Sequence, residues 1–205
     1  MPKDIDYAAK KIALRKWALP ECLHVPIAAV DESAITKYIG NVERVLSKGP
    51  LNKALLVSID AAPPRDLRLS IWENPNSTIL FSPLQVWVNV SYKRYRAAYK
   101  SAFPNEDIEG KVLSHAMNRR TANLKGFQFV RLTPVSRAAN SSSAFSEQWG
   151  VERYASSRKS PEEIRAGASI QYADFSDILL MMDTVVGGGV MEVVNIQQAL
   201  ITPNL

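Results

Sequence analysis

Two N-terminal segments carry apolar residues at helical spacing. The first spans 4–18 and ends before Pro20; its apolar positions are Ile5, Ala8, Ala9, Ile12, Ala13 and Trp17. A second stripe predicts a helix over 33–46, with Ser33 as its N-cap and Gly49-Pro50 as its stop. We expect the apolar side of both helices to face the core.

The pattern then changes to short apolar and alternating runs separated by turn residues. Leu67–Trp72 is the clearest alternation, with apolar residues at 67, 69 and 71. Strands are predicted over 54–59, 67–72, 78–81 and 84–90, with proline and asparagine clusters between them. Four short strands at this spacing predict a meander or a mixed sheet.

The second half of the chain returns to helical spacing. The pattern predicts helices over 91–103 and 106–124, a strand over 127–132, an ordered loop over 134–146, and a helix beginning at Pro161. Residues 178–186 are strongly apolar; Gly187–Gly189 interrupts the run, and 190–196 resumes it as a strand or short helix.

These elements together predict an α+β protein. N-terminal helices are followed by a small mixed or antiparallel sheet, then by a basic helical region with one further strand and an apolar C-terminal segment. We expect one domain over 1–205, with a sub-boundary near 156–161, where a polar connection precedes the C-terminal segment.

Composition narrows the class of protein. The single cysteine, Cys22, excludes an internal disulfide framework, and the interpretation is an intracellular protein in a reducing compartment. Cys22 lies close to His24, but we expect it to be a small buried hydrophobe rather than a nucleophile. No run of about 18 apolar residues occurs, so we expect neither a membrane-spanning helix nor a membrane partner.

The net charge of +5 is unevenly distributed along the chain. Residues 91–137 contain ten Lys or Arg and three carboxylates, a net charge of +7, which leaves −2 for the rest. No Asp or Glu occurs between Glu109 and Glu147. A local basic region favours a polyanionic partner, because each Lys or Arg beside a phosphate releases a condensed counterion. The partner we expect is nucleic acid.

The first candidate group is an aromatic and basic helix. Tyr92, Tyr95, Tyr99 and Phe103 share one helical stripe, and the cations beside it are Lys93, Arg94, Arg96 and Lys100. Tyr95 and Tyr99 either stack on bases while the cations hold phosphates, or face the core while the cations lie in water. The aromatic rings favour RNA or single strands slightly over duplex DNA.

Two more candidate groups follow along the chain. Arg119-Arg120 suits phosphate, because guanidinium groups bind its oxygens in pairs. The stretch 131–147 offers Arg131, Arg137 and Asn140 beside three serines, with Lys125 just before it. Each group has a structural alternative, a solvated helix end for the arginine pair and a polar surface loop for 131–147.

The order of His115, a strand and Asn140 resembles the His–Asn pair of HNH-type nucleases over about 30 residues. The resemblance implies His115 as the base that activates water, with Mg²⁺ holding the scissile phosphate. The chain departs from that pattern, since no histidine follows Asn140 and Glu109 is the nearest preceding carboxylate. Mg²⁺ is expected under the nuclease interpretation alone.

The common sequence motifs for nucleotide binding, metal binding and serine-hydrolase catalysis do not occur in the sequence. Gly187–Gly189 is not followed by Lys-Ser/Thr, and no GxGxxG, CxxC or GxSxG is present. Three interpretations remain: a non-enzymatic nucleic-acid-binding protein without a cofactor, a self-assembling nucleocapsid or coat-like subunit that associates through its apolar C-terminal segment as a homo-oligomer, and a degenerate HNH-like nuclease or toxin module.

Overall fold

The computed structural model describes residues 3–17, 24–47, 53–59, 79–142 and 144–185. Its elements, in chain order, are α1 (Tyr7–Trp17), β1 (Pro26–Ala29), α2 (Glu32–Ala34), the π-helix η2 (Ile35–Ile39), β2 (Asn41–Val45), β3 (Ala54–Ser58), β4 (Leu84–Asn89), α3 (Tyr95–Ala102), β5 (Lys111–His115), α4 (Arg119–Leu124), β6 (Phe129–Ser136), α5 (Arg137–Ser142), α6 (Ala144–Ala155), α7 (Pro161–Ile164), β7 (Ile170–Tyr172) and α8 (Phe175–Met181). Helices and strands thus form the α+β structure that the sequence predicts.

The seven strands form one antiparallel sheet in the order β2-β3-β4-β6-β1-β7, and β5 pairs with β6 outside this path. The long strand β6 organises the sheet. Its first half pairs with β4 and β1, and its second half pairs with β5, from Leu132↔His115 to Ser136↔Lys111. The register of β6 therefore decides which segments lie beside β5.

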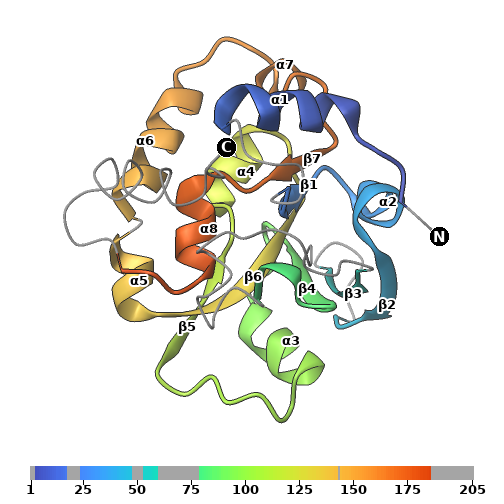
Figure 1. Ribbon diagram of the computed structural model, residues 1–205, viewed down its shortest axis with the longest axis vertical. Coiled ribbons are helices and arrows are strands. Elements are labelled where there is room, and N and C mark those ends of the chain that lie inside the picture. Colours follow the sequence, from blue (N-terminus) through green and yellow to red (C-terminus); the bar gives the residue numbers. More distant parts are fainter. Residues whose placement is uncertain (1–2, 18–23, 48–52, 60–78, 143, 186–205) are drawn as a thin grey trace, which may run out of the picture.

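Successive residues of each central strand point to opposite sides of the sheet, and both sides are buried along these strands. Leu56, Val88 and Val130 pack on one side with Tyr99 of α3, and α3 lies at the bottom of Figure 1. Residues one position along, including Trp87 and Phe129, pack on the other side with residues of α1 and η2. The sheet consequently forms the central layer between two groups of helices.

The structure confirms several predicted elements within a few residues. The helices near the N-terminus, over 91–103 and at Pro161 form as α1, α3 and α7, and the strands over 54–59, 84–90 and 127–132 form as β3, β4 and β6. Ser160 and Glu163 make a reciprocal capping box on α7. The predicted elements over 67–72, 187–189 and 190–196 lie outside the described residues.

Four predictions are wrong. The stretch 33–46 is not one helix, because a short helical turn ends at Gly40 and β2 follows. The predicted helix over 106–124 is instead β5, which pairs with β6, and the short helix α4. The predicted loop over 134–146 contains the end of β6, α5 and the start of α6. Residues 79–81 form a 3₁₀ turn rather than a strand.

The described part of the apolar C-terminal segment packs within the protein. Residues Ile178, Leu179, Leu180 and Met181 of α8 are buried, and Leu180 contacts Val135 and Ala139. Self-association through the segment from residue 186 onward stays a prediction, since those residues lie outside the described part of the chain. Among the described helices, none has the length and apolar character that crossing a membrane requires.

Candidate nucleic-acid interface

The structure divides the predicted basic and aromatic site residues by exposure. The exposed ones are Lys93, Arg94, Arg96, Lys100, Arg119, Arg120 and Arg137. Tyr95 and Asn140 are half-buried. Tyr99, Lys125 and Arg131 are buried, at 5%, 5% and 2% exposure. These three side chains are therefore left out of the surface that a polyanion would contact.

Residues from two separate stretches of the predicted region line one pocket of about 350 Å³. We call it the His115 pocket. Its lining residues are Val112, Leu113, Ser114, His115, Asn118, Arg119, Arg120 and Asn140. The pocket thus brings Asn140 of α5 to the arginine pair of α4, and no carboxylate is among these lining residues.

Local hydrogen bonds place the polar side chains of the His115 pocket. The Asn118 side chain caps α4 by accepting from the N–H groups of Arg120, at 2.9 Å, and Thr121, at 3.4 Å. This cap puts Arg119 and Arg120 in the first turn of α4, directly after β5. The Ser136 hydroxyl accepts from the N–H of Ala139 at 3.1 Å and so helps to start α5 at the end of β6.

The register between β5 and β6 explains why these segments meet. Lys111 at the start of β5 lies opposite Ser136, the last residue of β6. Since α5 follows Ser136 directly, its residues return along β5, and α5 contacts both strands. A predicted helix over 106–124 would not have produced this arrangement.

The environment of His115 in this pocket changes the pKa of its imidazole. Its ring makes an edge contact with the Tyr95 ring, with 4.8 Å between centroids. Burial, with a smaller contribution from the charge of Arg119, lowers the pKa of His115 to about 4. Its Nε2 is buried and has no hydrogen-bond partner among the described residues. The imidazole is therefore neutral at pH 7.

A second pocket of about 580 Å³ lies at the other end of β5. Its cations are Arg96, Lys100, Lys111 and Arg137, and its carboxylates are Glu106, Asp107 and Glu109. Lys111 of β5 and Arg137 of α5 line this second pocket, whereas later residues of the same two elements line the His115 pocket. Exposed cations therefore border both ends of β5, but the second pocket has mixed charge.

The predicted aromatic stripe, of which Tyr95 and Tyr99 lie in α3, belongs largely to the core. Tyr92 and Tyr99 are buried, and Phe103 packs against the same core cluster. The Tyr99 hydroxyl donates to the Glu106 carboxylate at 3.1 Å, and burial followed by this carboxylate raises the pKa of Tyr99. Tyr95 is half-buried; its ring contacts His115, but it is not among the residues that line the His115 pocket.

Lys125 has an internal role in place of the surface role that the sequence suggests. Its Nζ donates to Gln171 Oε1 at 2.5 Å and lies over the Phe127 and Tyr154 rings, at 5.7 and 5.3 Å from their centroids. Lys125 thus joins the end of α4 to β7 and α6. In sequence, nothing distinguishes this lysine from its exposed neighbours.

Comparison with protein-family models, with curated proteins and with solved structures gives no match.

Proposed function

We propose that this protein binds nucleic acid through the phosphate backbone at the His115 pocket. The observation that carries the proposal is the lining of that pocket, in which Arg119 and Arg120 stand beside two asparagines without a carboxylate. Guanidinium groups match the geometry of phosphate oxygens, and asparagine amides add neutral donors. A neutral His115 adds little charge, so the arginines supply the electrostatic attraction.

The exposed cations at the other end of β5 extend the surface. Arg96, Lys100, Lys111 and Arg137 offer contacts for neighbouring phosphates of the same strand, while three nearby carboxylates weaken that attraction. We assign the primary phosphate contacts to the His115 pocket and secondary ones to this region. Such binding has little sequence specificity and falls steeply with salt.

Within this proposal, RNA or single-stranded nucleic acid remains the favoured partner class. Fewer aromatic rings support this preference than the sequence suggests. With Tyr92 and Tyr99 buried, the half-buried Tyr95, whose ring contacts His115, is the tyrosine of the predicted stripe that we propose for base stacking. Phosphate contacts are the larger contribution. A filter-binding panel of RNA, single-stranded DNA and duplex DNA of equal length ranks the three partners.

The experiment that tests the proposal compares two double variants with the wild type. Arg119→Ala with Arg120→Ala removes the exposed pair that lines the His115 pocket. Arg158→Ala with Lys159→Ala removes an equal charge from the exposed connection before α7. The first pair of changes should weaken binding at least about tenfold and the second less than about threefold. Equal losses in the two variants would show attraction by net charge without a defined site.

A metal-dependent nuclease is the second candidate function. The observation that favours it is that His115 and Asn140, which lie 25 positions apart in the sequence, line one pocket. A neutral imidazole is the form that can accept a proton from water, although the His115 Nε2 is shielded from solvent in this structure. A pKa near 4 makes this base weaker than one matched to neutral pH. We therefore favour binding over cleavage as the function.

The donor set for Mg²⁺ is incomplete among the described residues, which contain no group of three or more His, Cys, Asp or Glu side chains suited to an ion. An RNA and plasmid degradation assay with Mg²⁺ separates the two functions. A binder leaves both substrates intact, and His115→Ala keeps its affinity within about threefold. Cleavage by the wild type that is lost in His115→Ala, but kept in His24→Ala, would establish the nuclease.

A further inference from the structure

Strands β4 and β6 separate partway along their length. Their pairing runs from Asn89↔Phe129 to Trp87↔Arg131 and stops there. Beyond that point β6 pairs with β5, whereas residues 84–86 of β4 pair with β3. The two strands thus form a fork, and Arg131 lies where it opens.

Pro134 gives a local reason for the fork. Continuation of the β4–β6 register would place Leu84 opposite Pro134, which has no N–H to donate. The Leu84 carbonyl instead accepts from the Ser82 hydroxyl at 2.7 Å. The Arg131 carbonyl accepts from the N–H of Ala116 on the β5 side, so the N–H and carbonyl of Leu132 point to the fork.

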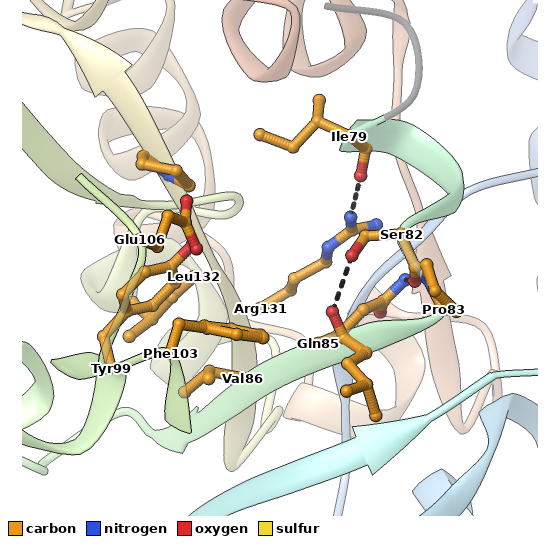
Figure 2. Close-up of a pocket in the computed structure, with 12 residues that line it drawn as sticks. Ile79, Ser82, Pro83, Gln85, Val86, Tyr99, Phe103, Glu106, Arg131 and Leu132 are labelled. Carbon is orange, nitrogen blue, oxygen red and sulfur yellow. Dashed lines mark hydrogen bonds between the residues drawn. The ribbon is translucent and has the colours of Figure 1, made fainter. Parts of the chain in front are cut away.

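A pocket of about 400 Å³ occupies the fork, within the range of small-molecule sites. Its apolar lining includes Val86, Phe103 and Leu132. Its polar lining includes Gln85, Tyr99, Glu106 and Arg131. Figure 2 shows Tyr99 and Glu106 on one side of the Arg131 side chain, and Ile79 and Ser82 on the other. It shares no lining residue with the His115 pocket.

Arg131 is the polar group that sets the chemistry of the fork pocket. Its Nη1 donates to the Leu80 carbonyl at 3.0 Å, and its Nη2 donates to the Ile79 carbonyl. Within the described part of the chain no ion pair with a carboxylate is present at Arg131. Burial lowers the pKa of Arg131 to about 9. A buried guanidinium with carbonyl partners and three further N–H groups has the capacity to bind an anion.

Glu106 decides which anion suits the site. Its exposed carboxylate lines the same pocket and accepts from the Tyr99 hydroxyl. A dianionic phosphate would be repelled by this carboxylate, while a single cation neutralises one negative charge. A planar carboxylate matches the paired N–H donors of a guanidinium group, and the apolar lining suits a ring or a short chain.

We infer that the fork between β4 and β6 is a binding site for a small monocarboxylate with an apolar body, held by Arg131 and by the backbone N–H of Leu132. This site is separate from the primary phosphate contacts, because it shares no lining residue with the His115 pocket; it shares Phe103 and Glu106 with the second pocket. It also gives Arg131 the anionic partner that a buried cation requires.

The test is a titration of the full chain with benzoate, followed by amide chemical shifts in ¹⁵N-labelled protein. We expect saturable shifts at Gln85, Val86 and Leu132 with a Kd of about 1 mM. Benzamide, which has the same shape without the charge, should bind at least about tenfold more weakly, and inorganic phosphate should not shift these amides. Arg119→Ala with Arg120→Ala should leave benzoate binding unchanged.

Two variants complete the test. Arg131→Met should abolish the benzoate shifts if it folds. Glu106→Gln changes an exposed residue and so does not depend on that outcome; by removing the competing negative charge it should tighten benzoate binding about threefold. The inference is overturned if benzoate produces no saturable shifts at the fork, if benzamide binds equally well, or if Glu106→Gln leaves the Kd unchanged or raises it.

Discussion

Asp6 joins the start of α1 to β7 through one buried carboxylate, exposed by 6%. Its Oδ1 accepts from the N–H groups of Ala8 and Ala9, each at 3.1 Å. Its Oδ2 accepts from the N–H groups of Ser169, at 2.7 Å, and Ile170, at 3.1 Å. One side chain therefore satisfies the first turn of a helix and the approach to an edge strand of the sheet.

Replacing Asp6 with Ala should lower the free energy of unfolding by about 2–4 kcal/mol, because buried N–H groups lose their acceptor. Urea denaturation measures the change. Asp4→Ala is the matched control: Asp4 is exposed, and its contact with Lys37 is 4.0 Å long, so its loss should cost less than about 0.5 kcal/mol. Similar costs for the two variants would contradict the assigned role of Asp6.

His115 links stability to pH. Its pKa falls from 6.5 to about 4 on folding. Between these values the unfolded chain gains a proton at this position and the folded protein does not, so stability present above pH 6.5 is lost as the pH falls toward 4. The loss due to His115 should be on the order of 2–3 kcal/mol.

Urea unfolding of the wild type and of His115→Gln at about pH 7 and about pH 4.5 checks this prediction. The variant should lose less stability between the two pH values than the wild type does. His24 also has a lowered pKa, chiefly through burial, and its contribution cancels in the comparison. An equal loss in both proteins would exclude His115 as the group responsible.

The hardest property of the site to predict from the sequence was which of its side chains are exposed and which are buried. Lys125 and Arg131 lie in the same basic region as Arg119 and Arg120, yet the first two are buried and the second two exposed. Charge alone does not separate them, because the distinction depends on rings and carbonyl groups that come from distant segments. The alternative that the tyrosines of the predicted helix over 91–103 face the core is correct for Tyr92 and Tyr99.

Among the secondary-structure elements, β2 shows how a close contact overrides a periodic pattern. The apolar spacing of 33–46 suits a helix, but Gly40 adopts an extended backbone with φ of −169°, and β2 begins at the next residue, beside β3. A Cβ at Gly40 would overlap the carbonyl oxygen of Ser58. A glycine at this position therefore permits the close approach of two backbone segments.

Gly40→Ala should destabilise the protein by about 2–3 kcal/mol, because the added methyl group meets backbone that has little room to move. Ser33→Ala, at an exposed position in the preceding helical turn, should change stability by less than about 0.5 kcal/mol. Thermal unfolding of the two variants provides the measurement. A stable Gly40→Ala protein would mean that β2 and β3 are not held so closely.

The helix prediction was also wrong at β5, for a different physical reason. Residues 111–115 were predicted as helix because their surroundings have helical spacing, but β6 supplies a pairing partner across all five positions. Strand pairing is a non-local contact, which a single segment does not report. By contrast, periodicity and caps within an element's own residues were sufficient to predict five elements correctly: α1, α3, β3, β4 and α7.

The protein as a whole concentrates its positive charge on segments that the sheet brings together. The sequence shows the net charge of +7 in residues 91–137, and this concentration required no structure to find. The antiparallel register of β5 and β6 then brings the start of α4 and Asn140 of α5 to one pocket. The sequence could suggest the arginine pair and Asn140 separately, but not that they line the same cavity.

The measurement that tests this account most directly is the salt dependence of RNA binding. In the wild type, log K should fall linearly with log salt concentration, and Arg119→Ala with Arg120→Ala should reduce the magnitude of the slope by about one to two. Arg158→Ala with Lys159→Ala should leave the slope unchanged within error. A slope that is unaffected by the first pair of changes, or reduced equally by the second, would contradict phosphate binding at the His115 pocket.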